Sequence, residues 1–211
     1  MPNRRLARPV HRRLLAAALL AALGCASGPA PRDHFYRLQV APPSRAPAEP
    51  TLHGTLEISR FRADALTGER QLIFLESSDA SEVRRHAYHR WVDPPSVMLQ
   101  IQLAGYLRAA HAAELVILPE VRVRPDFLLA GRILRLEQIL SEAASRVVVE
   151  LELSMTRMAG GDVMVLRRYR ESRALDSRDV AESVRAYGEA TSAIFERFLA
   201  EVRAMAKRPS E

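Results

Sequence analysis

The stretch that decides the fold is Val147–Thr156, which reads VVVELELSMT. Apolar and polar side chains alternate along most of it, the pattern of an antiparallel strand with one buried face. Ala159-Gly160-Gly161-Asp162 follows, and glycine accepts the positive φ that a tight hairpin turn requires. We therefore expect Val163–Ser172 to return beside the first strand, so that the whole stretch forms a β-hairpin.

More strand candidates precede this hairpin. Short runs of apolar, β-branched and aromatic residues between turn residues indicate strands. They are His34–Val40, Thr55–Phe61, Gln71–Leu75, Glu82–Val92, Leu115–Val123 (interrupted by Pro119) and Phe127–Leu136. The Pro-rich segment Ala41–Pro50 is expected to be a loop or linker. It is not a domain boundary, because the residues before it are too few to fold alone.

Two segments have the composition of helices. Ser96–Ala113 is one, and Pro95 suits its first turn, where a missing N–H has no cost. The second begins near Asp179, whose spacing from Glu182 is that of a capping box. Its apolar stripe indicates core packing and consists of Val180, Val184, Tyr187, Ile194, Phe198, Val202 and Met205. The order of elements predicts one α+β domain, with a mixed, largely antiparallel sheet packed by two main helices.

The first 24 residues have the three parts of a bacterial lipoprotein signal peptide. A basic region ends at Arg13, a ten-residue apolar run spans 14–23, and Gly24-Cys25 follows. The apolar run is half the roughly 20 residues that a membrane-spanning helix needs. Ala22-Leu23-Gly24-Cys25 resembles the lipobox, although Ala22 and Leu23 depart from its usual residues.

Cys25 is the only cysteine, which excludes an intramolecular disulfide. A lone cysteine is often a small buried apolar residue, but here it lies between the apolar run and a Pro-rich stretch, where there is no core. The lipobox resemblance implies a covalent lipid on Cys25, and several acyl chains together anchor a protein stably. We thus expect a signal peptide over 1–24, a lipidated tether over 25–33 and a single domain over 34–208.

The net charge of +6 comes almost entirely from the signal peptide. Five arginines and no acidic residue lie in it, which leaves 31 − 5 = 26 basic residues against 25 acidic residues in the mature chain. That balance gives no electrostatic footprint for nucleic acid.

No motif points to catalysis, a metal or a cofactor. The chain lacks a G-x-S-x-G elbow, a P-loop and a dinucleotide fingerprint. His86 and His89 have a spacing that sends them to opposite faces of a strand, so we expect separate surface histidines. Glu150 and Glu152 share a strand face without an evident partner and are expected to be solvated. The sequence makes no case for an enzyme.

The segment Tyr88–Leu99 is the most distinctive part of the chain. An aromatic-bearing strand runs into Pro94-Pro95 and then into a helix. Two interpretations stay open for Tyr88, Trp91, Pro94 and Pro95: a structural corner in which Trp91 covers the core, or a surface on which a partner docks.

The chain resembles the ABC-type transport auxiliary lipoproteins, the group that contains the paraquat-inducible lipoprotein component. The matching features are the lipobox region, Phe35-Tyr36-Arg37-Leu38, Gln71-Leu72-Ile73-Phe74 and the tryptophan–double-proline segment. A strand over 128–136, an alternating strand pair and a terminal helix follow in the same order. The resemblance implies an α/β sandwich similar to the N-terminal domain of TolB.

The same resemblance implies a function and a location. Such proteins work beside an ABC ATPase, a permease and a protein with a mammalian-cell-entry domain, moving lipids or other hydrophobic molecules between membranes. Ala26 after the lipidated cysteine implies the periplasmic face of the outer membrane rather than the inner membrane. Our hypothesis is a non-catalytic adaptor held by its lipid anchor. The alternative is a structural assembly lipoprotein of an envelope secretion or pore complex, and an envelope hydrolase is a third, unsupported one.

Overall fold

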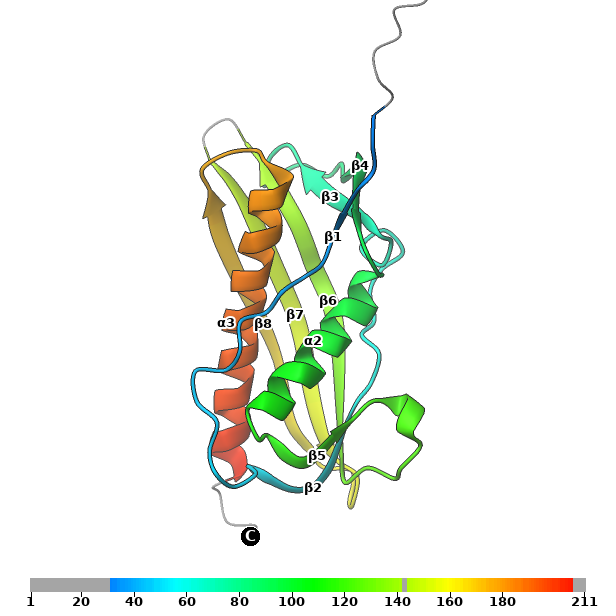
Figure 1. Cartoon of the computed structure of the whole chain (residues 1–211), viewed down its shortest axis with the longest axis vertical. Coiled ribbons are helices and arrows are strands. Elements are labelled where there is room, and N and C mark those ends of the chain that lie inside the picture. Colours follow the sequence, from blue (N-terminus) through cyan, green and yellow to red (C-terminus); the bar gives the residue numbers. More distant parts are fainter. Residues whose placement is uncertain (1–30, 142–143, 207–211) are drawn as a thin grey trace, which may run out of the picture. The chain divides into compact units, whose positions relative to one another are not determined.

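The computed structural model describes residues 31–141 and 144–206. The expected signal peptide, the expected lipidation site Cys25 and the end of the expected domain at 207–208 lie outside these described residues. Figure 1 shows the eight strands and two long helices in chain order. The strands are β1 (His34–Tyr36), β2 (Leu52–Ile58), β3 (Gln71–Leu75), β4 (Arg84–Trp91), β5 (Ala113–Ile117), β6 (Phe127–Leu140), β7 (Ser145–Arg157) and β8 (Val163–Leu175). The long helices are α2 (Pro95–Ala109) and α3 (Val180–Ala206), and Pro119–Val121 forms a 3-10 turn, η2.

The eight strands form one mixed sheet, as the sequence predicts. β6 pairs with β7 along one edge over thirteen register pairs, and β7 pairs with β8. The other edge of β6 is shared: β2 pairs with its beginning and β3 with its end. The short pairings β1–β4, β2–β5, β2–β6 and β3–β6 are parallel, whereas the long ladders and β3–β4 are antiparallel.

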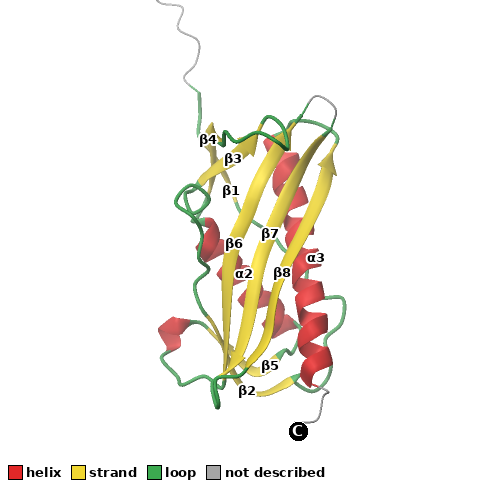
Figure 2. Ribbon diagram, turned by 180° about the vertical axis from the view of Figure 1, so that it is seen from behind, coloured by secondary structure: helices red, strands yellow, loops and turns green. Residues whose placement is uncertain are grey.

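Both helices lie on the same face of the sheet, so Figure 2, from behind, shows β6, β7 and β8 without a covering helix. The core forms between helices and sheet because α3 buries the stripe that the sequence indicates, and every second residue of β7 points toward it. Its largest buried side chains include Trp91, Tyr169, Tyr187, Phe195 and Phe198. We call the opposite side of β6–β8 the outer face.

The central hairpin is longer and more buried than its alternation predicts. β7 extends from Ser145 to Arg157, and β8 continues three residues past Ser172. Val148 points away from the core cluster yet is fully buried, as is Ile139, and the nearby Leu75 is 5% exposed. These side chains form a second, smaller apolar cluster on the outer face near one end of the sheet. The predicted pattern of one buried and one exposed face therefore holds only for the remainder of β7.

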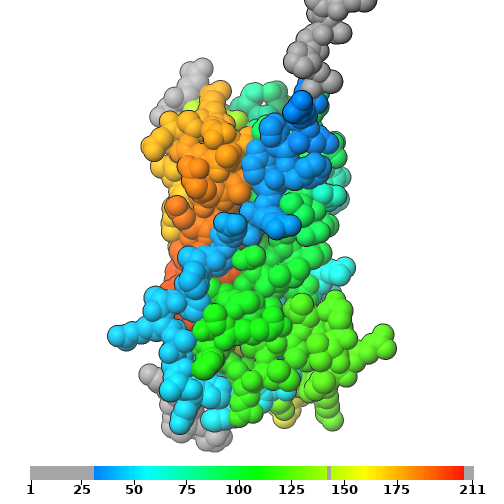
Figure 3. Space-filling model, in the orientation of Figure 1, coloured from blue at the N-terminus to red at the C-terminus, as the bar shows by residue number. Residues whose placement is uncertain are grey.

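The segment after β1 corrects the predicted strand His34–Val40, which ends at Tyr36. Residues 37–50, which we call the strap, cross the outside of the two helices instead of pairing with a strand (Figure 3). Leu38 enters the core, the Val40 N–H donates to Gln102 Oε1 at 3.2 Å on α2, and the Ala41 N–H donates to Ser192 Oγ at 2.9 Å on α3. Residues 41–50 are therefore a loop, as predicted, and the strap to which they belong bridges the two helices.

One glycine lets the strap lie close to α3. A Cβ at Gly188 would stand 2.2 Å from the carbonyl oxygen of Gln39, a distance that no side chain tolerates. The helix carries no side chain there because the backbone of the strap occupies the space.

Other boundaries shift for identifiable reasons. α2 ends at Ala109, because the chain turns through His111 with positive φ and begins β5 at Ala113. Pro119 ends β5 and starts η2. At the start of α3, Glu182 does not complete a capping box with Asp179. Its carboxylate accepts hydrogen bonds from the N–H groups of Asp176 and Ser177, at 2.7 and 3.1 Å.

Candidate docking site at the β1–β4 corner

The three residues of β1 form the edge of the sheet and pair only with β4. The register is His34 with His89, Phe35 with Arg90 and Tyr36 with Trp91. The Val92 N–H adds a hydrogen bond to the carbonyl of Tyr36 at 2.8 Å. The described domain therefore begins at a strand that is held on one side only.

Trp91 and the two prolines build the turn from β4 into α2. Trp91 is 2% exposed, and its ring meets that of Tyr187 on α3 edge-on, with centroids 5.7 Å apart. Pro94 caps α2 with extended φ/ψ, and Pro95 opens its first turn. Trp91 and Pro95 are buried, which fits the structural-corner interpretation for these residues.

Tyr88 lies apart from the other three because its side chain faces solvent, 44% exposed. Phe35 on the neighbouring strand is 56% exposed, and the guanidinium of Arg70 lies 5.7 Å from the centre of its ring. Arg70 is fixed there because its Nε donates to the carbonyl of Trp91 at 3.0 Å. Exposed aromatics with arginines are the side chains that protein interfaces favour.

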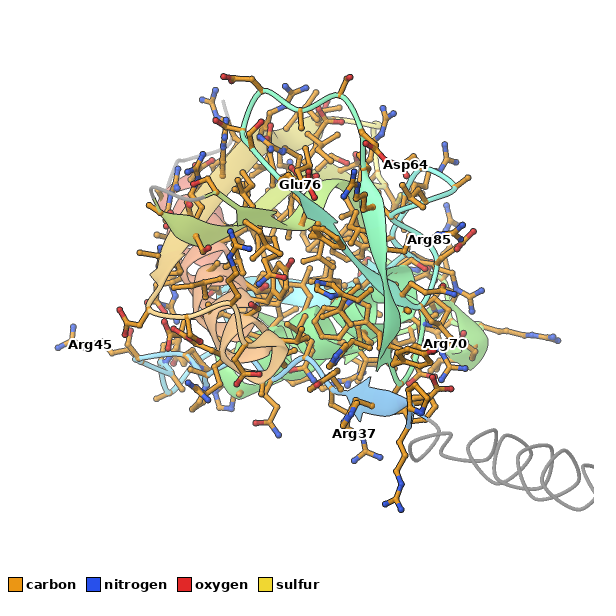
Figure 4. The ribbon with its side chains drawn as sticks, turned by 90° about the horizontal axis from the view of Figure 1, so that it is seen from above. Arg37, Arg45, Asp64, Arg70, Glu76 and Arg85 are labelled. Carbon is orange, nitrogen blue, oxygen red and sulfur yellow. The ribbon has the colours of Figure 1, made fainter. Side chains whose placement is uncertain are left out.

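We call Phe35, Arg70, Tyr88 and Arg90 the aromatic–arginine patch. Figure 4 shows Arg70 on the same side of the domain as Arg85 of β4, with Arg45 of the strap on the opposite side. Sequence reasoning missed Arg70, since it precedes β3 and meets Phe35 only through the fold. The exposure of Phe35 could have been predicted, because it precedes the inward-facing Tyr36 on a strand and therefore points to the opposite face.

His86 and His89 are close neighbours, which corrects the expectation that they lie on opposite faces. A register shift within the β3–β4 pairing changes the alternation between them. Their rings meet edge-on with centroids 5.6 Å apart, and His34 stacks on His89 at 5.0 Å. We call His34, His86 and His89 the histidine cluster.

Hydrogen bonds connect the histidine cluster to β1 and α3. The Tyr36 hydroxyl is 2.8 Å from His89 Nδ1, and His86 Nε2 is 2.9 Å from Gln138 Oε1. The Gln138 amide in turn donates to Ser183 Oγ on α3. Burial lowers the pKa of His86, and burial together with the neighbouring histidines lowers the pKa of His89. The surroundings of His86 and His89 therefore favour their neutral forms.

Among the described residues, no group of three or more His, Cys, Asp or Glu side chains is arranged to hold a metal ion. Likewise, no described helix is both long and apolar enough to cross a membrane. Glu150 and Glu152 are not simply solvated: the Glu150 carboxylate lies 3.7 Å from Arg168 and 4.0 Å from Arg170, and Glu152 lies 4.0 Å from Arg168.

The family model for the ABC-type transport auxiliary lipoprotein component matches residues 36–197. The chain belongs to this family. Its members are lipoproteins of transport systems, so membership gives this auxiliary lipoprotein an envelope location at a membrane and an association with an ABC transport system. That role agrees with a protein that is not an enzyme. Cys25, the expected lipid attachment site, lies outside the matched and the described residues.

Solved structures share the fold of this auxiliary lipoprotein. A Xanthomonas campestris protein superposes with a TM-score of 0.71 at 16% identity, covering 82% of this chain and 97% of its own. An uncharacterized protein gives 0.65 at 12% identity, with 82% and 99% covered. A hypothetical protein from Chlamydia trachomatis gives 0.50 at 10% identity, with 74% and 98% covered. No curated protein matches the chain. At these identities the likeness concerns the fold alone, and it agrees with the predicted α+β class.

Proposed function

We propose that this chain is a non-catalytic adaptor in an ABC-type transport system of the mammalian-cell-entry kind. It supports the movement of lipids or other hydrophobic molecules between the inner and outer membranes. A lipid on Cys25 holds it at the periplasmic face of the outer membrane, and its domain docks a protein with a mammalian-cell-entry domain, which works with the ABC permease and ATPase. The match of the family model to residues 36–197 is the observation that carries the transport role.

The aromatic–arginine patch is the docking surface in this proposal. Phe35 of the patch lies on β1, and Tyr88 and Arg90 lie on β4, the strand with which β1 pairs. Phe35 and Tyr88 provide exposed aromatic area at a small cost in side-chain entropy, and Arg70 adds a charge that is already held in position. Trp91 supports β4 by packing against Tyr187 of α3, and the buried Pro95 opens α2.

The test is affinity purification of the full-length lipidated protein from crosslinked envelopes, followed by mass spectrometry. We expect recovery of a mammalian-cell-entry protein with its ABC subunits. The double variant Phe35→Ala/Tyr88→Ala is expected to lose most of that recovery. Val163→Ala/Leu166→Ala is the matched control, because it removes two equally exposed apolar side chains from β8.

Two results would contradict the proposal in different ways. Recovery of only the chain itself, or of a secretion or pore complex, would favour the assembly-lipoprotein alternative. Recovery of the transport subunits by the Phe35/Tyr88 variant at wild-type levels would keep the transport role and exclude the patch. Cys25→Ser, with retention of the signal peptide and loss of membrane-anchored mature protein, tests the anchor separately.

A further inference from the structure

The free edge of β6 holds a cleft on the outer face, away from the β1–β4 corner. β2 covers only the beginning of that edge, at Phe127–Leu129, and β3 covers only the end, at Gln138–Ile139. Between them a single parallel bridge joins Arg62 to Arg132. The result is a cleft of about 510 Å³ lined by Arg62, Ala63, Ala130, Gly131, Arg132, Glu152 and Ser154.

The backbone holds Arg62 firmly beside β6. Its N–H donates to the carbonyl of Gly131 at 2.8 Å, and its carbonyl accepts from the Ile133 N–H at 2.7 Å. The preceding Phe61 is buried on the helix side, over Gly131, where a Cβ would stand 2.3 Å from the phenyl ring. Gly131 therefore allows Phe61 to lie close to β6. Because successive residues of an extended chain point to opposite faces, Arg62 lies on the outer face.

This bridge places two like charges in register. Side chains at paired positions of neighbouring strands project from the same face, and like charges there destabilise the pairing. Neither arginine has a carboxylate within 4.0 Å among the described residues. Glu152 is the register partner of Arg132 on β7, but its ion pair is with Arg168 of β8.

Other arginines of the outer face differ from Arg62 and Arg132, because they do have glutamates nearby. Glu150 lies between Arg168 and Arg170, and Arg135 pairs with Glu137 on its own strand. Arg135, Arg168 and Arg170 each therefore lie within 4.0 Å of a glutamate on this face. In the cleft, Arg62 and Arg132 have no carboxylate of the described residues within 4.0 Å, although Glu152 lines the cleft together with Ser154.

We propose that this cleft binds a phosphate-type oxyanion between Arg62 and Arg132, either free phosphate or the phosphodiester of a lipid headgroup. Guanidinium groups bind such anions through two parallel N–H···O bonds each. An anion between them replaces the repulsion of the two arginines with attraction, and Ser154 offers a further donor. The site is separate from the aromatic–arginine patch and does not depend on the docking proposal.

The test is isothermal titration calorimetry of the full-length lipidated protein in nonionic micelles, in low-salt buffer without phosphate. One arm titrates inorganic phosphate and the other monomeric dihexanoyl-phosphatidylglycerol. We expect saturable binding of at least one of the two. Arg62→Gln and Arg132→Gln should each weaken it at least about tenfold, or about 1.4 kcal/mol, and the double variant should abolish it.

Arg124→Gln is the control, because it removes one positive charge from an exposed position outside the cleft. Competition between the two titrants shows that both use the cleft, and saturation by only one of them identifies the source of the anion. The proposal is overturned if neither titrant saturates, if the double variant binds like the wild type, or if Arg124→Gln weakens binding as much as the cleft variants. Thermal melting of each variant verifies that it is folded.

Discussion

The meander β6–β7–β8 and the strap both cover the core, but different contacts hold them. The meander consists of consecutive strands in continuous antiparallel ladders, with the odd-numbered side chains of β7 fully buried from Val147 to Met155. The strap has no ladder and is held by individual hydrogen bonds to side chains of α2 and α3. The comparison teaches that apolar burial stabilises the first region, whereas close backbone fit to a helix positions the second.

The largest expected effect comes from opening a cavity in the meander. Leu151 is fully buried at the middle of β7. Leu151→Ala should lower the free energy of unfolding by about 2–5 kcal/mol, because the surrounding core relaxes only partly around lost methyl groups. Urea unfolding followed by circular dichroism measures the change.

Leu166→Ala is the matched control on the next strand. Leu166 is 59% exposed, so the same truncation should change the free energy of unfolding by less than about 0.5 kcal/mol. Equal losses in the two variants would show that the meander is not the packed core that we describe.

A smaller effect is expected where the strap crosses α3. Gly188→Ala places a Cβ against the Gln39 carbonyl, which belongs to the backbone and cannot rotate away. The strap must shift, at a cost of about 1–3 kcal/mol, partly offset by the better helix propensity of alanine, about 1 kcal/mol. Hydrogen exchange should show faster exchange of the Val40 and Ala41 amides, whose acceptors are on the two helices.

Gly105→Ala on α2 separates the cost of the Cβ clash from the gain in helix propensity. Nothing lies within 4 Å of a Cβ at Gly105, so only the propensity gain acts, and the variant should be more stable by up to about 1 kcal/mol. If both glycine variants stabilise the protein, the strap does not lie against α3 as closely as the structure has it.

The same difference explains what the sequence could predict. The meander could be predicted from the sequence because its strands pair with their neighbours in the chain. The alternation of apolar and polar residues also indicates which face of the sheet each side chain lies on. Alternation did not predict the burial of Val148 on the outer face, nor the last residues of β6 and β8, which extend beyond the predicted strands. The family resemblance and the mixed sheet with two helices were also predicted correctly.

The strap and both candidate sites depend on distant partners. Ala41 and Ser44 bind residues 151 and 152 positions away, and no local pattern records such a contact. The register shift in β4 that joins His86 to His89 has no signature in the sequence, so strict alternation gave the wrong faces. Arg62 and Arg132 meet only because Gly131 lets Phe61 pack over β6.

The smallest expected effect concerns the edge where the strap begins. Because the folded state lowers the pKa of His86 and His89, the unfolded chain binds protons first as the pH falls below about 6.5. The contribution of these histidines to the free energy of unfolding is therefore intact above that pH. It is lost as the pH falls through the lowered pKa values that His86 and His89 have in the folded protein. Asp179, which raises the pKa of His89, moderates the loss.

Protonation should loosen β1 before it affects the meander, since His34 and Tyr36 contact His89 directly. The contact of the meander with this cluster, between His86 and Gln138 of β6, is a hydrogen bond that favours protonated His86. Hydrogen exchange at pH 7.5 and 5.0 measures this. We expect faster exchange of the Val92 amide, which donates to Tyr36, at the lower pH after correction for intrinsic rates. His86→Gln/His89→Gln should remove that pH dependence, whereas His53→Gln, on the exposed part of β2, should retain it. Equal loss of protection against exchange in the meander at pH 5.0 would mean that β1 and the meander do not differ in their sensitivity to protonation.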